Sequence, residues 1–353
     1  MNDIKTAELL IKSAIGKIAT GPTLSKDLSF EDTQEVMQIV LQGQTSSVRQ
    51  ALFLIALRMK CETMDENRGI LSAIKKESDS QSVAVDNLID LGDPYSGFDR
   101  SLPVSSFLPP LLAEMGLPTI IHSLKSVSPK FGLTHHHICQ EMGLNPLVST
   151  LDAKTKIEDK NIGWSYIDQA IFCKGLHNLV PLRDEIIKRS VVNTVETLTK
   201  PFSGNKTHSI LGYVHKPYPP IYANLADFSG FDTSLLIRGV EGGVVPSMRQ
   251  KGLMISYAGI NEVDRVEIEP SELGIKQDIR SIISKDESVK DMAKRTVELG
   301  VEALNGKTGA FYDGLVLSAS LILWHTKKAK SLIEAAEMVR STLDGAKSIN
   351  RIK

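Results

Sequence analysis

The sequence predicts an α/β protein with a small N-terminal all-helical domain and a central, mostly parallel sheet flanked by helices. Residues 1–76 carry only amphipathic helical patterns with clear capping signals, whereas short apolar runs alternate with helical stretches from residue 83 onwards. Such alternation is typical of strands buried on both faces of a parallel sheet. We therefore predict a helical domain over 1–76, joined by helices from about 163–195, and an α/β domain over 83–353.

The helical domain is justified by periodicity and by its caps. Ser29 is followed by Asp32, and Thr63 by Glu66, and both pairs suit the start of a helix because the side chains can bond the free N–H groups there. The Thr63 and Glu66 pair forms a capping box. The helices predicted in this segment span 7–18, 29–41, 46–59 and 63–74.

The α/β domain is predicted from apolar runs that are too short for helices. Candidate strands span 88–91, 118–122, 234–238, 253–258 and 263–268. A helix over 109–115 separates the first two strands. Two amphipathic helices over 312–325 and 331–343 close the chain.

Composition excludes several classes of protein. Apolar residues make up 42% of the 353 residues and charged residues 24%, which favours neither disorder nor a membrane span. The longest apolar runs, 51–57 and 315–324, are too short to cross a bilayer, and no signal-peptide apolar region follows the first residues. We expect a cytoplasmic protein that makes no membrane contact. The net charge of −1 means that any anion site must be local.

The three cysteines argue against a disulfide framework or a zinc cluster. Cys61, Cys139 and Cys173 are widely separated and odd in number. We expect all three to be buried thiols.

Several segments together resemble the anthranilate phosphoribosyltransferases and their nucleoside phosphorylase relatives. The stretch 50–63, the pair Ser105 and Ser106 with the following Gly116, the segment 126–132, and the stretch 181–201 match the family in order. The resemblance implies a small helical domain and a larger α/β domain with the active site in the cleft between them. It also implies a homodimer through the helical domain, for which the apolar faces of 7–18 and 34–41 are candidates, although core packing explains those faces equally well.

The phosphate-binding loop of the family is not preserved. The family binds phosphoribosyl pyrophosphate on a Gly-Thr-Gly-Gly-Asp loop, whose glycines let backbone N–H groups approach phosphate. At that place this chain has Asp93-Pro-Tyr-Ser-Gly97. Proline removes a donor, tyrosine fills space and Asp93 repels pyrophosphate. We predict that this loop does not hold that substrate.

Other family contacts are partly retained. Pro103 replaces an asparagine, while Ser105 and Ser106 keep the Ser-Thr positions, where hydroxyls serve equally well as phosphate ligands or as helix caps. Ile121 and Leu124 replace a lysine and an asparagine, and Leu133 replaces a serine of a later segment. Arg183 corresponds to the arginine that faces anthranilate's carboxylate; alternatively it is a surface arginine paired with Asp184 or Glu185.

Metal binding shows the sharpest departure. The family supplies adjacent carboxylates to magnesium, and Val244 and Val245 stand at those positions here. Glu241 survives at an earlier acidic position. We therefore expect no cofactor, doubt magnesium, and assign neither a catalytic residue nor a metal ligand. The run His135-His136-His137 is disfavoured as a metal site because consecutive residues do not share a face; His135 more simply caps a helix or lines the cleft.

Basic residues nevertheless follow the cleft segments. They are Arg100, His122, Lys125, Lys130, Arg183, Arg238, Arg249 and Lys251. Aromatic residues on the same segments serve either as stacking surfaces for bases or, more simply, as core: Tyr95, Phe98, Phe107, Phe131 and Trp164. The residues predicted to form an anion-binding cleft are Arg100, Ser105, Ser106, His122, Lys125, Lys130, Arg183 and Arg238.

Two hypotheses follow from these residues. In the first, the protein has lost the anthranilate reaction and binds a phosphorylated small molecule or single-stranded nucleic acid in the interdomain cleft. In the second, it is an active glycosyl or phosphoribosyl transferase with a different acceptor.

Overall fold

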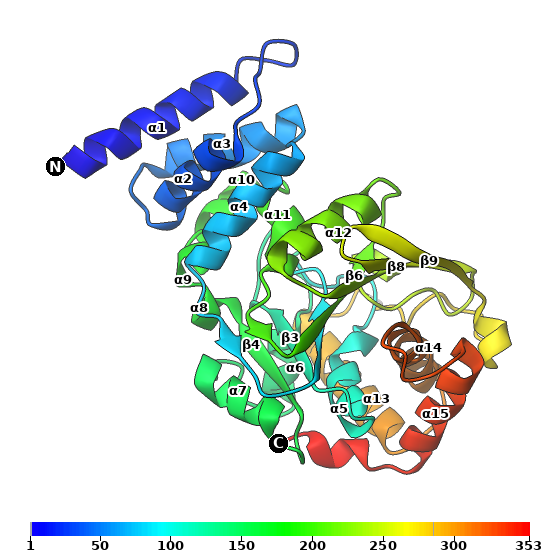
Figure 1. Cartoon of the computed structure of the whole chain (residues 1–353). Coiled ribbons are helices and arrows are strands. Elements are labelled where there is room, and N and C mark those ends of the chain that lie inside the picture. Colours follow the sequence, from blue (N-terminus) through cyan, green and yellow to red (C-terminus); the bar gives the residue numbers. More distant parts are fainter. Residues whose placement is uncertain (1, 285) are drawn as a thin grey trace.

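The computed structural model describes residues 2–284 and 286–353, and the first four helices form a compact group at one end of the molecule (Figure 1). These helices are α1 (Asn2–Ile18), α2 (Phe30–Leu41), α3 (Ser47–Lys60) and α4 (Met64–Lys76). The predicted caps are confirmed. Ser29 Oγ accepts from the Asp32 N–H, and Thr63 and Glu66 form the reciprocal capping box at the start of α4. Glu66 also accepts from the Leu28 N–H, which ties the loop before α2 to α4.

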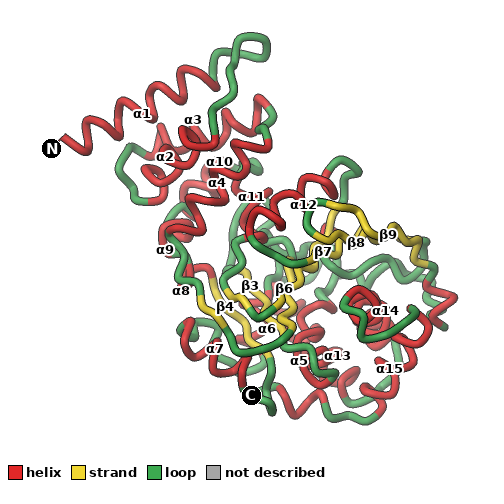
Figure 2. Tube along the Cα trace, in the orientation of Figure 1, coloured by secondary structure: helices red, strands yellow, loops and turns green. Residues whose placement is uncertain are grey.

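A seven-stranded sheet forms the centre of the second domain (Figure 2). Its strands, in spatial order, are β4 (Trp164–Asp168), β3 (Thr119–Ser123), β2 (Asn87–Gly92), β6 (Lys206–Tyr213), β7 (Thr233–Arg238), β8 (Gly252–Ala258) and β9 (Asn261–Ile268). The first five are parallel, and β8 and β9 are added antiparallel. A separate parallel pair joins β1 (Gln81–Ser82) to β5 (Phe202–Ser203). The predicted fold class is confirmed.

Helices cover both faces of the sheet because successive strand residues point to opposite sides. Ile89 lies in the core formed with α5 (Leu108–Glu114), α6 (His135–Glu141), α13 (Val289–Leu304), α14 (Ala310–His325) and α15 (Leu332–Asp344). Its neighbour Leu88 lies in the opposite core, which continues into the N-terminal helices. Helices that contribute to that second face are α7 (Thr150–Glu158), α8 (Gln169–Phe172), α9 (Lys174–His177), α10 (Val180–Ile186), α11 (Val192–Val195) and α12 (Tyr218–Ser229). Five short 3₁₀ turns complete the chain: η1 (Val104–Phe107), η2 (Glu196–Leu198), η3 (Val240–Gly242), η4 (Pro270–Leu273) and η5 (Ser348–Arg351).

The two domains are joined by packing as well as by the chain. Helices α10 and α11 contact α3 and α4, and the stretch 163–195 begins with strand β4 of the large sheet before these helices start. Arg68 of α4 donates to Asn224 of α12, and Lys75 Nζ donates to Ser229 Oγ at 2.8 Å. Burial lowers the pKa of Lys75 to about 8.

Two sequence expectations concern single features of the described chain. Cys139 and Cys173 are buried free thiols, as predicted, but Cys61 is exposed just after α3, so the prediction was wrong for that residue. Within the described residues, no helix combines the length and the apolar character needed to cross a membrane.

Candidate functional site

The loops that follow β2, β3 and β7 meet at the carboxyl ends of the parallel strands. Asp93, directly after β2, is 1% exposed and accepts three hydrogen bonds. Its Oδ1 accepts from the Val244 N–H at 2.9 Å, and its Oδ2 accepts from Ser105 Oγ and from His135 Nε2. The carboxylate is thus held by donors from η1, from the start of α6 and from the loop after β7, which explains how it is accommodated away from water.

This arrangement accounts for both serines that the sequence singled out. Ser105 donates to Asp93, while Ser106 Oγ lies 2.8 Å from His135 Nδ1. Because His135 Nε2 donates to the Asp93 carboxylate, its Nδ1 accepts from Ser106. Both serines are buried, so their hydroxyls face protein groups and not an open cleft.

His122 belongs to a second buried chain of hydrogen bonds. Its Nε2 lies 2.9 Å from Asp90 Oδ1, and its Nδ1 contacts the Tyr95 hydroxyl. Burial raises the pKa of Tyr95, so the phenol stays protonated and donates to the imidazole. Both rings are buried, and the side chain of His122 has no surface to offer a ligand.

Arg183 is committed to an internal carboxylate. The side chain is 2% exposed, and its two Nη atoms donate to Glu196 at 2.8 and 2.9 Å. The interpretation of Arg183 as a surface arginine paired with Asp184 or Glu185 was therefore wrong. Asp184 instead accepts from the Ser128 N–H. The forked pair ties α10 to η2 and commits both Nη atoms of the guanidinium to a buried carboxylate.

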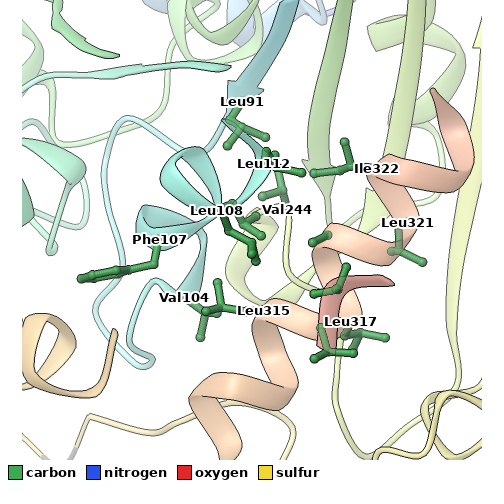
Figure 3. Packing of buried hydrophobic residues seen from close by; sticks show 14 of the residues in the cluster. Leu91, Val104, Phe107, Leu108, Leu112, Val244, Leu315, Leu317, Leu321 and Ile322 are labelled. Atoms are coloured by element: carbon green, nitrogen blue, oxygen red, sulfur yellow. The ribbon is translucent and has the colours of Figure 1, made fainter. Parts of the chain in front are cut away.

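The positions of the family's metal ligands are apolar in three dimensions as well as in sequence. Val244 is fully buried among Leu91, Leu108 and Leu112 (Figure 3). Its backbone N–H alone reaches the polar network, through Asp93.

Glu241, in the loop after β7, joins that loop to the loops after β2 and β3. It accepts from the Arg100 N–H, from Ser101 Oγ and from Lys130 Nζ at 2.6 Å. Although burial acts to raise the pKa of Glu241, its hydrogen bonds with Asp99, Lys130 and Ser101 outweigh burial and lower the pKa to about 2. The carboxylate is therefore ionised and already paired, and Lys130 is occupied by it.

The three consecutive histidines have three different partners. His135 bonds Asp93 and Ser106, His136 Nδ1 lies 2.7 Å from Asp168, and His137 caps the start of its own helix through Thr134. Among the described residues, no group of three or more histidine, cysteine or acidic side chains is placed to hold a metal ion.

An open cavity of about 720 Å³ lies beside this network, and its lining comes from the α/β domain alone. We call it the cationic cavity because five basic side chains line it: Arg100, Arg238, Arg249, Lys251 and Arg280. All five are exposed. Two acidic residues, Glu241 and Asp278, also line it.

Only Arg100 and Arg238 of the predicted anion-binding residues line this cavity. Arg249 and Lys251, also noted in the sequence, join them, whereas Arg280 was not among the predicted residues. Lys125 is exposed but does not line the cavity. Of the aromatic candidates, Phe131 alone is exposed, at 47%, while the other four are core residues.

The fold is a helical bundle domain followed by an α/β domain, which is the two-domain architecture of a glycosyl transferase family. Residues 12–78 match the helical bundle domain of a glycosyl transferase family, and residues 96–348 match the α/β domain of that family, so the chain belongs to it. An uncharacterized protein of Aquifex aeolicus is 28% identical over 315 residues, covering 89% of this chain and 93% of the relative. The anthranilate phosphoribosyltransferase of Acetivibrio thermocellus is 24% identical, covering 97% of this chain and 95% of the relative.

Solved structures agree on the fold. The anthranilate phosphoribosyltransferase of Saccharomyces cerevisiae in complex with PRPP and Mg superposes with a TM-score of 0.76 at 16% identity, covering 98% of this chain and 96% of that one. The Thermus thermophilus enzyme gives 0.73 at 18% identity, with 97% of each chain covered. The chain is thus an anthranilate phosphoribosyltransferase-like protein of divergent sequence.

Proposed function

We propose that this protein has lost the anthranilate reaction and binds a phosphorylated ligand or single-stranded nucleic acid at the cationic cavity. The observation that carries the proposal is the gathering of five basic side chains around one cavity on a chain whose net charge is −1. Of the two acidic side chains there, Glu241 is neutralised by Lys130. Local charge, not net charge, governs attraction of a phosphate.

Loss of the anthranilate reaction is supported by three separate departures. Asp93 places a carboxylate in the loop that holds pyrophosphate in the family, and Val244 and Val245 cannot ligate magnesium. The Arg183 guanidinium forms an ion pair with the buried carboxylate of Glu196. Each departure removes a different partner of the transition state, so their costs multiply.

Titration of a fluorescein-labelled oligothymidylate, followed by fluorescence anisotropy at several salt concentrations, tests the proposal. We expect salt-sensitive binding, and the Arg238→Ala and Arg280→Ala double variant should lower the slope of log K against log salt by about 1.4, since each cation on a single strand contributes about 0.7. Arg265→Ala is the matched control, because Arg265 is 54% exposed on β9 and does not line the cavity.

Small phosphates are tested by calorimetry with inorganic pyrophosphate on the same proteins. Absence of binding to both the oligonucleotide and pyrophosphate at low salt would sink the proposal. Binding that is unchanged in the double variant would place the site elsewhere and count equally against it.

An active transferase with a different acceptor is the second candidate. The survival of an ionised Glu241 at an acidic position of the family's metal segment favours it. Tight, magnesium-dependent binding of phosphoribosyl pyrophosphate in calorimetry would support this candidate. Absence of any heat signal with phosphoribosyl pyrophosphate, with or without magnesium, would rule this candidate out.

We also propose a homodimer through the helical domain. Leu9 of α1 and Val48, Leu52 and Met59 of α3 are exposed by 44 to 76%, and α1 contacts α3. The other predicted surface, 34–41, is unsuitable because the apolar side chains of α2 are buried in the core. Light scattering after gel filtration should give twice the chain mass, and Val48→Glu with Met59→Glu should give a monomer. A monomeric parent protein would overturn this.

A further inference from the structure

A second pocket, of about 170 Å³, lies between the helical domain and the α/β domain. Its walls come from α3, the loop after β2, the turn from α10 to α11, and the start of α12. These helices lie at the end of the sheet that faces the helical domain (Figure 1). Ligand pockets for larger organic molecules usually measure about 300–1,000 Å³, so this pocket has room for a single ring system.

One wall of this second pocket is aromatic. The ring of Tyr218 lies 5.3 Å from that of Tyr222 and 6.3 Å from that of His215, and all three side chains line the pocket together with Tyr213. Centroid separations of about 4.5–7 Å are those at which aromatic rings attract one another. A planar ring that enters the pocket can extend this series of tilted rings, whose planes meet at 41° and 50°.

The second pocket is also lined by a residue with a buried polar group that has no partner. Ser190 is 2% exposed and lines the second pocket, and its Oγ has no hydrogen-bond partner among the described residues. Its backbone N–H, by contrast, donates to Asn193 Oδ1. A buried hydroxyl left unpaired is costly. A bound ring with a polar edge would supply the partner that the Ser190 hydroxyl lacks.

The second pocket and the cationic cavity adjoin, because Val214 and Glu241 line both. We infer that the ligand is a nucleotide, with its heteroaromatic base in the second pocket and its phosphate in the cationic cavity. The phosphate half rests on the proposed function, whereas the base half rests on the aromatic rings that line the second pocket and on Ser190. The same unit occurs as a free mononucleotide and within a single strand.

Calorimetry with uridine monophosphate and ribose 5-phosphate separates the two halves of the site. Stacking of a base on an aromatic side chain corresponds to about a 5- to 150-fold change in affinity, so we expect the nucleotide to bind at least about fivefold more tightly than the sugar phosphate. His215→Ala and Ser190→Val should bring the nucleotide to the affinity of the sugar phosphate while leaving the sugar phosphate unchanged. Phe228→Ala is the matched control, since Phe228 lies on α12, is 38% exposed and does not line the pocket.

The outcomes distinguish this inference from the proposed function. Equal affinities for the nucleotide and the sugar phosphate in the parent protein overturn the base pocket and leave the cationic cavity standing. If only the oligonucleotide binds, weakening by Ser190→Val assigns the pocket to a base of a strand, and no weakening overturns the inference. If no phosphate probe binds at all, both the proposed function and the inference fall.

Discussion

Replacement of Asp93 by alanine tests the central feature of the site. The side chain is 1% exposed and accepts from the Val244 N–H, from Ser105 Oγ and from His135 Nε2. Alanine removes the only carboxylate oxygens in these three contacts and leaves three donors facing a small void. His135 and Ser106 then lose the orientation that the carboxylate imposes on them.

The magnitude follows from the donors left behind. Each unsatisfied buried donor costs about 1–3 kcal/mol, and breaking a buried charged contact by deleting one partner costs about 3–5 kcal/mol in total. We expect a loss of about 4 kcal/mol for Asp93→Ala. Since the unfolding entropy grows by about 2 cal/mol/K per residue, a chain of 353 residues should lose roughly 5 °C in Tm. The Tm of Asp93→Asn should lie between those of the parent protein and Asp93→Ala. An amide keeps the shape of the carboxylate, but its NH2 group faces at least one of the three donors.

Differential scanning fluorimetry of the three proteins measures this effect. Asp99→Ala is the matched control, because Asp99 lies in the same loop with its side chain 39% exposed, and its contacts with Lys130 at 3.6 Å and with Glu241 lie at the surface. Exposed pairs are worth about 0–1 kcal/mol, so the control should lose about 1 °C or less. A Tm for Asp93→Ala that equals that of Asp99→Ala would refute the reasoning that Asp93 is the centre of the network.

Three further predictions concern other parts of the chain. Arg183→Met should destabilise the protein by about 3–5 kcal/mol in urea unfolding because it leaves the Glu196 carboxylate buried without its cation. The double variant Arg183→Met with Glu196→Leu should recover most of this loss. If the single and the double variant lose the same stability, the ion pair is not the cause. Burial, with smaller contributions from nearby cationic groups, lowers the pKa of His325 to about 3, below its usual value of about 6.5. The neutral imidazole therefore contributes its whole share of the free energy of unfolding above pH 6.5. That free energy should fall by about 1.4 kcal/mol per pH unit as the pH is lowered towards 5. His325→Gln should remove this pH dependence of the free energy of unfolding, whereas His215→Gln, at an exposed position, should keep it. Identical pH dependence in the parent protein and both variants would contradict this. With anthranilate, phosphoribosyl pyrophosphate and magnesium, the loss of anthranilate fluorescence should be undetectable, since each lost charge partner costs about 10²-fold or more, and measurable turnover would show that the chemistry survives.

The fold was largely predictable because its signals are local. Capping pairs such as Thr63 with Glu66 lie three residues apart, and the strand at 234–238 is a short apolar run. Strand β6 was missed for a physical reason. β6 carries Thr207, His208 and Ser209 in buried positions, where His208 bonds Asn87 and Thr233 across the sheet. A strand whose buried residues are polar has no apolar pattern to read.

The site was less predictable because its partners are distant in sequence. Asp93 and Val244 are separated by 151 residues, and Arg183 meets Glu196 across a turn and not along one helix face. Sequence reasoning treated Asp93 only as a charge that repels phosphate. Which donors surround a buried carboxylate depends on how the loops meet, and no spacing rule contains that information.

The geometry of Asp93 explains why the two serines persist beside a loop that has lost its glycines. The sequence left Ser105 and Ser106 open between phosphate ligands and helix caps, and neither role describes the contacts they make. Ser105 donates to the Asp93 carboxylate, and Ser106 bonds the imidazole that donates to the same carboxylate. The donors therefore surround an anion that the chain itself provides, so an external anion at this point would compete with a covalently attached one. For that reason a phosphorylated ligand is better sought at the cationic cavity, where exposed guanidinium groups line open space.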